Sequence, residues 1–184
     1  TSVIALTVSH EVGHMFNLLH DGTDTLTYYY GHDSGVRSWG PIMGAPWGRS
    51  VTTWSNGGYP YADNFEDDLQ IVAGVIAEPL LGTQYIPDEA GNTIATAAEL
   101  PITVPVNTSG VITRSTDVDY YMFKAVAGPL DITVTPAAFD PDLDVQLELY
   151  DALSNKLATA PANATALSAR LNYNISATGN YYLA

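Results

Sequence analysis

The sequence predicts an α+β protein in which a helical, loop-rich N-terminal part is followed by an all-β sandwich. Residues 1–78 contain all four histidines, all three tryptophans and most of the glycines. Residues 79–184 contain neither histidine nor tryptophan, and they alternate apolar and polar residues as strands do. Because Pro79 stops a helix and Gly82 favours a turn, we expect the boundary between the two domains at residues 78 and 79.

The first helix is predicted over residues 2–16. Asparagine adopts the left-handed backbone conformation more readily than most residues, so Asn17 is expected to end this helix. Apolar residues recur at every third or fourth position and form one stripe along the predicted helix. They are Ile4, Val8, Val12 and Met15.

Residues 21–64 are rich in glycine and lack a periodic pattern, so they are predicted to be loops that carry a functional surface. Asp63 or Asn64 is expected to cap a second helix. Three acidic residues then occupy its first turn, where the helix dipole favours negative charge, and four apolar residues form its buried face. The acidic residues are Glu66, Asp67 and Asp68, and the apolar ones are Leu69, Val72, Ala73 and Ile76.

Apolar residues at every second position predict short strands in the second domain. Gly, Pro, Asn or Asp separates these segments, which is typical of an all-β sandwich. The predicted strands include Ile132 and Val134, residues 143–150, and the ranges 118–125, 166–175 and 179–183.

Charge and composition exclude several classes of partner. Six basic residues against 20 acidic ones give a net charge of −14, so nucleic acid and anionic membrane surfaces would repel the chain. A helix that spans a membrane needs about 18 consecutive apolar residues, and the sequence has no such run. Since the chain has no cysteine, any metal must be held by histidines and carboxylates.

Histidines near the N-terminus have the spacing of a metal site. His10 and His14 lie four residues apart, so on a helix they face the same way and can chelate one ion. His20 would lie about 240° around a continued helix from His14, so the chain must bend at Asn17 to bring it to that ion. Three neutral imidazoles and one water make an open tetrahedral zinc site. Glu11 lies beside the ligands, where it can contact the water.

This arrangement predicts hydrolysis of a peptide bond. Zinc lowers the pKa of its water toward ~7 and polarises the substrate carbonyl. Glu11 is expected to take a proton from that water as general base and to deliver it to the leaving amine. We therefore predict Zn²⁺ as cofactor, Glu11 as the catalytic residue, and His10, His14 and His20 as the metal ligands.

The run His10-Glu11-x-x-His14-x-x-Asn17-x-x-His20-Asp21 resembles the elongated zinc motif of the metzincin metallopeptidases. An aspartate directly after the third histidine is most similar to the reprolysin-like branch. The resemblance implies that residues 1–78 are the C-terminal, lower part of such a catalytic domain. The upstream sheet that binds the substrate backbone is then expected in a preceding part of a longer chain. Asn17 replaces the family's usual glycine at the bend.

The segment Pro41-Ile42-Met43-Gly44 resembles the Met-turn of the same family. The resemblance implies that Met43 lies beneath the three imidazoles without ligating the metal. It also implies that Asp21 anchors its loop near this turn. Ala45 occupies the position where the astacin and serralysin branches place a tyrosine, so no tyrosine ligand is expected.

Segments of the second domain resemble the bacterial pre-peptidase C-terminal domain, a β-sandwich appended to secreted proteases. The resemblance implies that residues 79–184 form such a domain, truncated at its last strand, in a secreted, extracellular bacterial protein. The matching segments are Gly110-x-Ile112, Asp117-x-Asp119-Tyr120-Tyr121-x-Phe123, Leu143 to Asp151, and Gly179-x-Tyr181-Tyr182-Leu183.

Several residues have two interpretations. His32 is interpreted as a solvated loop residue rather than a substrate contact or an accessory metal ligand. Trp39, Trp47 and Trp54 are interpreted as loop packing rather than a specificity pocket. Acidic residues 66–68 are interpreted as a helix cap rather than as a zinc ligand. Calcium is a further candidate cofactor, held by Asp117 and Asp119 or by Asp140, Asp142 and Asp144, although solvated turns are the alternative.

We therefore expect a piece of a secreted zinc endopeptidase that acts on a protein or peptide substrate. The alternative is a non-catalytic adhesion or substrate-binding module in which zinc is only structural. A third expectation is that the β-sandwich recruits a polymeric substrate such as a matrix protein or a polysaccharide.

Overall fold

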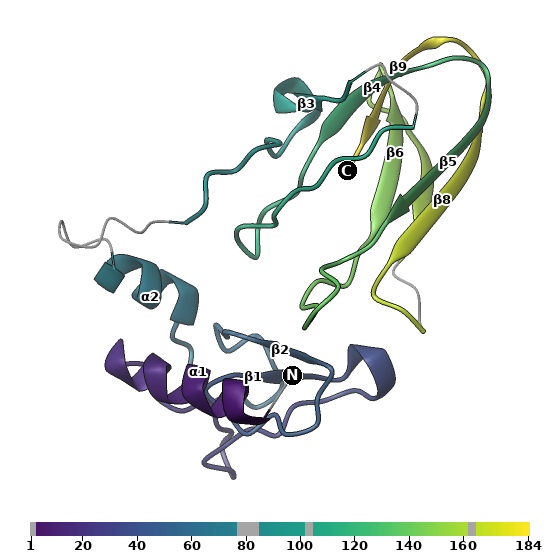
Figure 1. Ribbon diagram of the computed structural model, residues 1–184. Helices are drawn as coiled ribbons and strands as arrows, with labels where there is room; N and C mark the ends of the chain where they lie inside the picture. Colours follow the sequence, from purple (N-terminus) through teal and green to yellow (C-terminus); the bar gives the residue numbers. More distant parts are fainter. Residues whose placement is uncertain (1–2, 77–84, 102–104, 162–164) are drawn as a thin grey trace. The chain divides into compact units, whose positions relative to one another are not determined.

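The structure is a computed structural model that describes residues 3–76, 85–101, 105–161 and 165–184 (Figure 1). It is a mixed α+β fold with more sheet than helix. The chain divides into two compact units, one built mainly from residues up to Tyr85 and the other mainly from residues after it. The predicted boundary between residues 78 and 79 lies outside the described residues.

Helix α1 spans Val3–Met15, which confirms the first predicted helix. It ends in a left-handed turn, because Asn17 has a φ of 67°. The amide of Asn17 donates to the carbonyl of His14 at 3.0 Å, and the amide of Leu18 donates to that of Gly13 at 3.1 Å. This pair of bonds is the Schellman pattern, which satisfies the last carbonyls of the helix and turns the chain back along it.

The apolar stripe predicted on α1 lies at the surface of its unit. Ile4 is 76% exposed and Met15 is 82% exposed, whereas Leu6 and Gly13 are buried. The helix therefore packs on its own unit through a different face. Helical spacing identifies which residues share a face, but it does not identify which face the neighbouring loops cover.

The loop region between the helices is held by two short parallel strands that the sequence did not predict. Strand β1, Trp39–Pro41, pairs with β2, Val51–Thr53, after a 3₁₀ turn over Gly35–Arg37. The next residue, Ile42, donates to the carbonyl of Thr53 at 2.8 Å, and Gly44 donates to that of Pro41 at 3.0 Å. These bonds form a tight turn around Met43.

Helix α2 spans Asp68–Ile76 and begins later than predicted. Asp67 caps it, since its Oδ1 accepts the amide of Gln70 at 3.0 Å. The predicted caps have other partners: Asn64 accepts the amide of Glu66, and Asp63 accepts that of Gly22. Leu69, predicted to be buried, is 38% exposed.

Among its described residues, the second unit has seven strands in two sheets, with a 3₁₀ turn over Ile94–Thr96 before the first (Figure 1). One sheet has the order β3-β4-β9-β6-β7 and the other pairs β5 with β8. Every strand pair is antiparallel except β3 with β4. The strands are β3 Ala98–Glu99, β4 Tyr121–Ala125, β5 Gly128–Val134, β6 Leu147–Asp151, β7 Lys156–Ala160, β8 Ala169–Ile175 and β9 Gly179–Leu183.

Strand β9 has the bounds that the sequence predicts, but β6 does not. It begins at Leu147, four residues after the predicted start at Leu143. Leu147 pairs with Ala160, which is the last residue of β7, so no described residue of β7 pairs with the residues before Leu147. Pro161 follows and has no amide hydrogen to continue the ladder.

Both sheets contribute to one apolar core. Leu147 and Leu149 of β6 are buried together with Leu171 and Ile175 of β8. This shared core is what the predicted sandwich requires, since each sheet covers one face of the other.

Replacement of Leu149 by alanine is expected to destabilise the second unit by about 2–5 kcal/mol, because a fully buried leucine leaves a cavity. Leu153→Ala is the matched control, since Leu153 is 82% exposed. Urea unfolding followed by fluorescence or circular dichroism measures both. Equal losses for the two variants would contradict the assignment of the core.

Candidate metal centre

Three imidazole rings come together at one end of α1. His10 and His14 lie one turn apart on the helix, and the turn at Asn17 returns His20 to them. The ring centroids are 4.9, 5.3 and 4.7 Å apart, and one ring nitrogen from each residue lies within 4.8 Å of the others. The Nε2 atoms of His14 and His20 are 3.0 Å apart. Two nitrogens bound to one tetrahedral zinc lie ~3.4 Å apart, so the spacing suits a shared ion.

The opposite nitrogens of two rings are hydrogen-bonded to the backbone. Nδ1 of His10 lies 2.8 Å from the carbonyl of Ile42, and Nδ1 of His14 lies 2.9 Å from that of Leu18. Because a carbonyl only accepts, each Nδ1 carries the proton and each Nε2 keeps a free lone pair. Such bonds orient metal-binding histidines and fix their tautomer, so the donor set fits zinc.

The environment of His20 favours its neutral form. Burial lowers the pKa of its imidazole, and the neighbouring His14 and His10 lower it further, while Glu11 acts in the opposite direction. Neutral imidazole is the form that binds a metal.

Glu11 lies on α1 between the turns that carry the histidines, and its side chain is exposed. In the part of the chain that the structure describes, its carboxylate has no hydrogen-bond partner. It is therefore free to bind a water molecule or a substrate proton beside the three rings.

Met43 lies against α1 at Gly13, which stands between His10 and His14 in the helix. It is fully buried, and a methyl group at Gly13 would collide with its sulfur. The same methyl group would lie 3.1 Å from the ring of Trp54. Glycine at position 13, between the two helical ligands, therefore permits the close approach of Met43 that the Met-turn resemblance implies.

Asp21 joins the histidine loop to the turn around Met43 through its backbone. Its amide donates to the carbonyl of Met43 at 3.0 Å, and its own carbonyl accepts the amide of Tyr29 at 2.7 Å. Its carboxylate is fully buried; one oxygen lies 3.5 Å from the hydroxyl of Tyr59, and the other has no partner among the described residues. Burial, followed by the charge of Asp68, raises the pKa of Asp21 to about 7.

Tyr28 is a neighbour of the site that the sequence reasoning missed. Its ring centroid lies 4.4 Å from that of His20 and 6.3 Å from that of His10. The tyrosine run at residues 28–30 was the available signal, but spacing along a loop does not predict which ring reaches the histidines.

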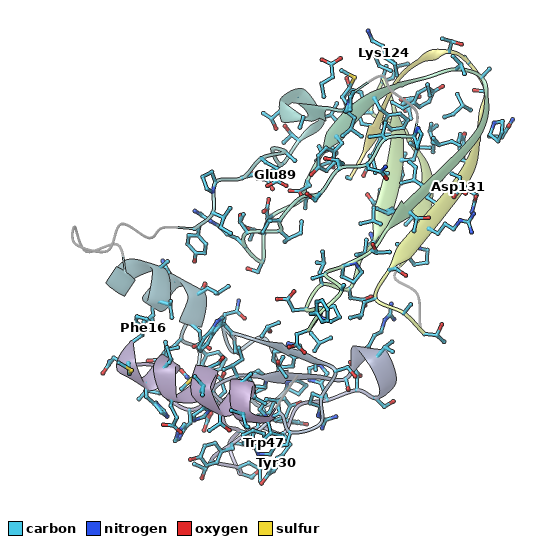
Figure 2. The ribbon with its side chains drawn as sticks, in the orientation of Figure 1. Phe16, Tyr30, Trp47, Glu89, Lys124 and Asp131 are labelled. Atoms are coloured by element: carbon cyan, nitrogen blue, oxygen red, sulfur yellow. The ribbon has the colours of Figure 1, made fainter. Side chains whose placement is uncertain are left out.

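Two of the three tryptophans pack the loops, as the sequence predicts. Trp39 donates to the hydroxyl of Thr53 at 2.8 Å and packs on His32, and Trp54 lies beneath α1. Trp47 is half exposed (Figure 2). His32 is more enclosed than a solvated loop residue, because it also contacts the hydroxyl of Tyr29 at 3.1 Å.

The acidic residues before α2 bind backbone amides. Glu66 accepts the amide of Leu19 at 3.0 Å, and Asp68 accepts that of Ser55 at 2.9 Å. Within the described chain, the group of possible metal ligands that includes His10 and His14 contains the three histidines and no carboxylate. No described residue of this acidic run joins the histidines as a ligand, but only Asp67 caps α2, so the cap interpretation is wrong for Glu66 and Asp68.

A second group of possible metal ligands lies in the β unit, where calcium was one interpretation. Asp117 and Asp119 come together with Asp88, and the carboxylate of Glu89 is near enough to affect them (Figure 2). One buried oxygen of Asp117 and one of Asp119 lack a partner among the described residues. Burial, then Glu89 and the other two aspartates, raises the pKa of Asp119 to about 6.

The alternative calcium residues do not form such a group. Among the described residues, Asp140, Asp142 and Asp144 are not brought together as possible metal ligands. Of the two sets of aspartates, only the one with Asp117 and Asp119 forms a group that could bind calcium among the described residues.

No protein-family model, curated protein or solved structure matches this chain. The two family resemblances therefore stay predictions. None of the described helices is both long enough and apolar enough to cross a membrane.

The stability of the first unit is expected to depend on pH through Asp68. This carboxyl is fully buried, one oxygen has no partner among the described residues, and burial raises its pKa to about 6. The folded state then holds the proton more tightly than the unfolded state, whose pKa is near 3.8. The energetic cost is absent below pH ~4, grows through pH 4–6 and is complete above it.

Replacement by asparagine removes this cost and keeps an oxygen for the amide of Ser55. Asp68→Asn is expected to gain about 1–3 kcal/mol relative to wild type between pH 4.5 and pH 8. Asp67→Asn, at the exposed neighbour, controls for the loss of charge alone. Denaturant unfolding across this range measures the difference, and a difference that does not change with pH would contradict the prediction.

Calcium is expected to stabilise the β unit if Asp88, Asp117 and Asp119 hold it. Added Ca²⁺ would then raise the Tm of the wild type by several degrees at neutral pH and leave the Tm of Asp119→Asn unchanged. Asp142→Asn, which alters the other candidate set, should respond like wild type. A wild-type Tm that does not move with Ca²⁺ would rule out the calcium interpretation.

Proposed function

We propose that this chain carries the zinc centre of a metal-dependent endopeptidase. One observation carries the proposal: three imidazoles face one point beside an exposed glutamate. His10, His14 and His20 supply three nitrogen ligands, and no fourth ligand comes from the part of the chain that the structure describes. A site with three protein ligands and one open position is typical of catalytic zinc.

Each residue has a distinct part in the proposed reaction. Zinc supplies a Lewis acid that polarises the scissile carbonyl. Glu11 takes a proton from the attacking water and then transfers it to the amine that leaves, so the peptide bond breaks without a covalent enzyme intermediate. The hydrogen bonds to Ile42 and Leu18 keep His10 and His14 in the required tautomer.

We further propose that residues 1–78 are the C-terminal part of a metzincin catalytic domain of the reprolysin-like type. The support is the elongated motif, the bend at Asn17 and the close approach of Met43 to Gly13 between the two helical histidines. The proposed substrate is a protein or peptide, and the proposed location is extracellular.

The β unit is proposed to be a pre-peptidase C-terminal domain. Its shared apolar core and antiparallel strands support this proposal. Such a unit would give the protease a surface that can hold a polymeric substrate, which stays a prediction of the sequence.

Glu11→Gln is expected to lower kcat for cleavage of a generic protein substrate by about 10²–10⁴-fold in the full-length protein, because glutamine cannot accept the proton. Its zinc content, measured by elemental analysis, should stay at one ion per chain. Glu99→Gln, an exposed glutamate in the β unit, is the matched control and should keep full activity.

Two outcomes would separate the alternatives. Undiminished cleavage by Glu11→Gln would exclude Glu11 as the base. A wild type that binds zinc but cleaves nothing would favour the non-catalytic binding module with structural zinc.

A further inference from the structure

The three histidines are held in different ways. His10 and His14 each donate a hydrogen bond to a backbone carbonyl and are attached to a helix. His20 lies in a loop, and within the part of the chain that the structure describes its Nδ1 atom has no hydrogen-bond partner. The third imidazole therefore lacks the backbone bond that orients the other two.

His20 instead packs against an aromatic ring. The ring of Tyr28 packs on that of His20 with 4.4 Å between centroids and 45° between planes. Among the described residues, this is the shortest distance between a histidine ring and a tyrosine ring. Tyr28 is 38% exposed, so it covers His20 on one side and meets solvent on the other. A ring in this position restricts the rotation of the imidazole.

Backbone hydrogen bonds hold the residue that follows Tyr28. Its neighbour Tyr29 donates its amide to Asp21 at 2.7 Å and accepts the amide of Ala45 at 2.9 Å. The ring of Tyr29 stacks on buried Tyr59 at 4.5 Å with 9° between planes. Tyr28 directly precedes this anchored residue, and its own ring packs on that of His20.

Arg49 holds the segment that follows. Its guanidinium donates to the carbonyls of Tyr30, Gly31 and Asp33 at 2.7, 3.1 and 3.0 Å. One side chain thus binds the backbone of three residues that follow Tyr28. The chain directly after Tyr28 is therefore held both by the bonds of Tyr29 and by Arg49.

We propose that Tyr28 is a positioning residue of the metal centre, which holds the imidazole of His20 in its ligating orientation through ring packing. This inference rests on the proposed zinc site and extends it beyond the three ligands and Glu11. Groups that orient a metal ligand typically affect metal affinity by 10–100-fold.

The ring, not the hydroxyl, is proposed to act, so a pair of substitutions tests it. Tyr28→Phe keeps the ring and should bind Zn²⁺ and Co²⁺ within about twofold of wild type. Tyr28→Ala removes it and should weaken both by about 10-fold in a chelator competition. The visible absorption of the Co²⁺ form should change for Tyr28→Ala alone, because His20 no longer has a defined orientation.

Two controls accompany the pair. Tyr30→Ala removes an exposed tyrosine two residues away and should leave metal affinity unchanged. Tyr28→Leu, which fills the volume without a planar ring, replaces Tyr28→Ala if the latter does not fold by circular dichroism. It should show the same loss of affinity and the same spectral change.

The outcomes distinguish this proposal from the proposed function. If wild type and Tyr28→Ala bind Co²⁺ equally well with equal spectra, Tyr28 has no positioning role although the metal site stands. If Tyr28→Phe loses as much affinity as Tyr28→Ala, the hydroxyl and not the ring is responsible, and the proposal is wrong. A wild-type chain that binds neither metal overturns the zinc site and this proposal together.

Discussion

The candidate metal centre depends on one backbone conformation, the left-handed turn at Asn17. Without it, α1 would continue and His20 would lie on the far side of the helix from His10 and His14. The turn satisfies the last helical carbonyls through Asn17 and Leu18, and Leu18 then places its own carbonyl against Nδ1 of His14. The residue pair that ends the helix thus also orients a ligand, so local chain geometry and metal chemistry are set by the same few bonds.

Local spacing predicts the ligands well, because two histidines on one helix and a third after a bend are related by helix geometry alone. Contacts between distant segments are harder to predict. Tyr28 packs on His20 while the adjacent Tyr29 is bonded to Asp21 and Ala45, and no sequence pattern specifies these contacts. The exposed stripe of α1 and the late start of α2 have the same cause, since a neighbouring loop decides which face is covered and which acid becomes the cap.

Two buried aspartates lower the stability of the first unit, but they also make hydrogen bonds that hold the loops around the candidate metal centre. Asp21 and Asp68 are both fully enclosed, and burial raises the pKa of each. Asp68 nevertheless accepts the amide of Ser55, and the backbone of Asp21 connects the histidine loop to Met43. Carboxylates kept at such a cost are common where a loop must be held in one arrangement around a functional centre.

The number of ligands favours a catalytic over a structural metal. Structural zinc is normally enclosed by four protein ligands, and here the described chain brings together three nitrogens and no fourth donor. Glu11 lies on α1 next to His10, is exposed, and has no hydrogen-bond partner among the described residues. A structural role would require a fourth donor from outside these residues and would leave the carboxylate of Glu11 unexplained, whereas hydrolysis uses both the open position and the base.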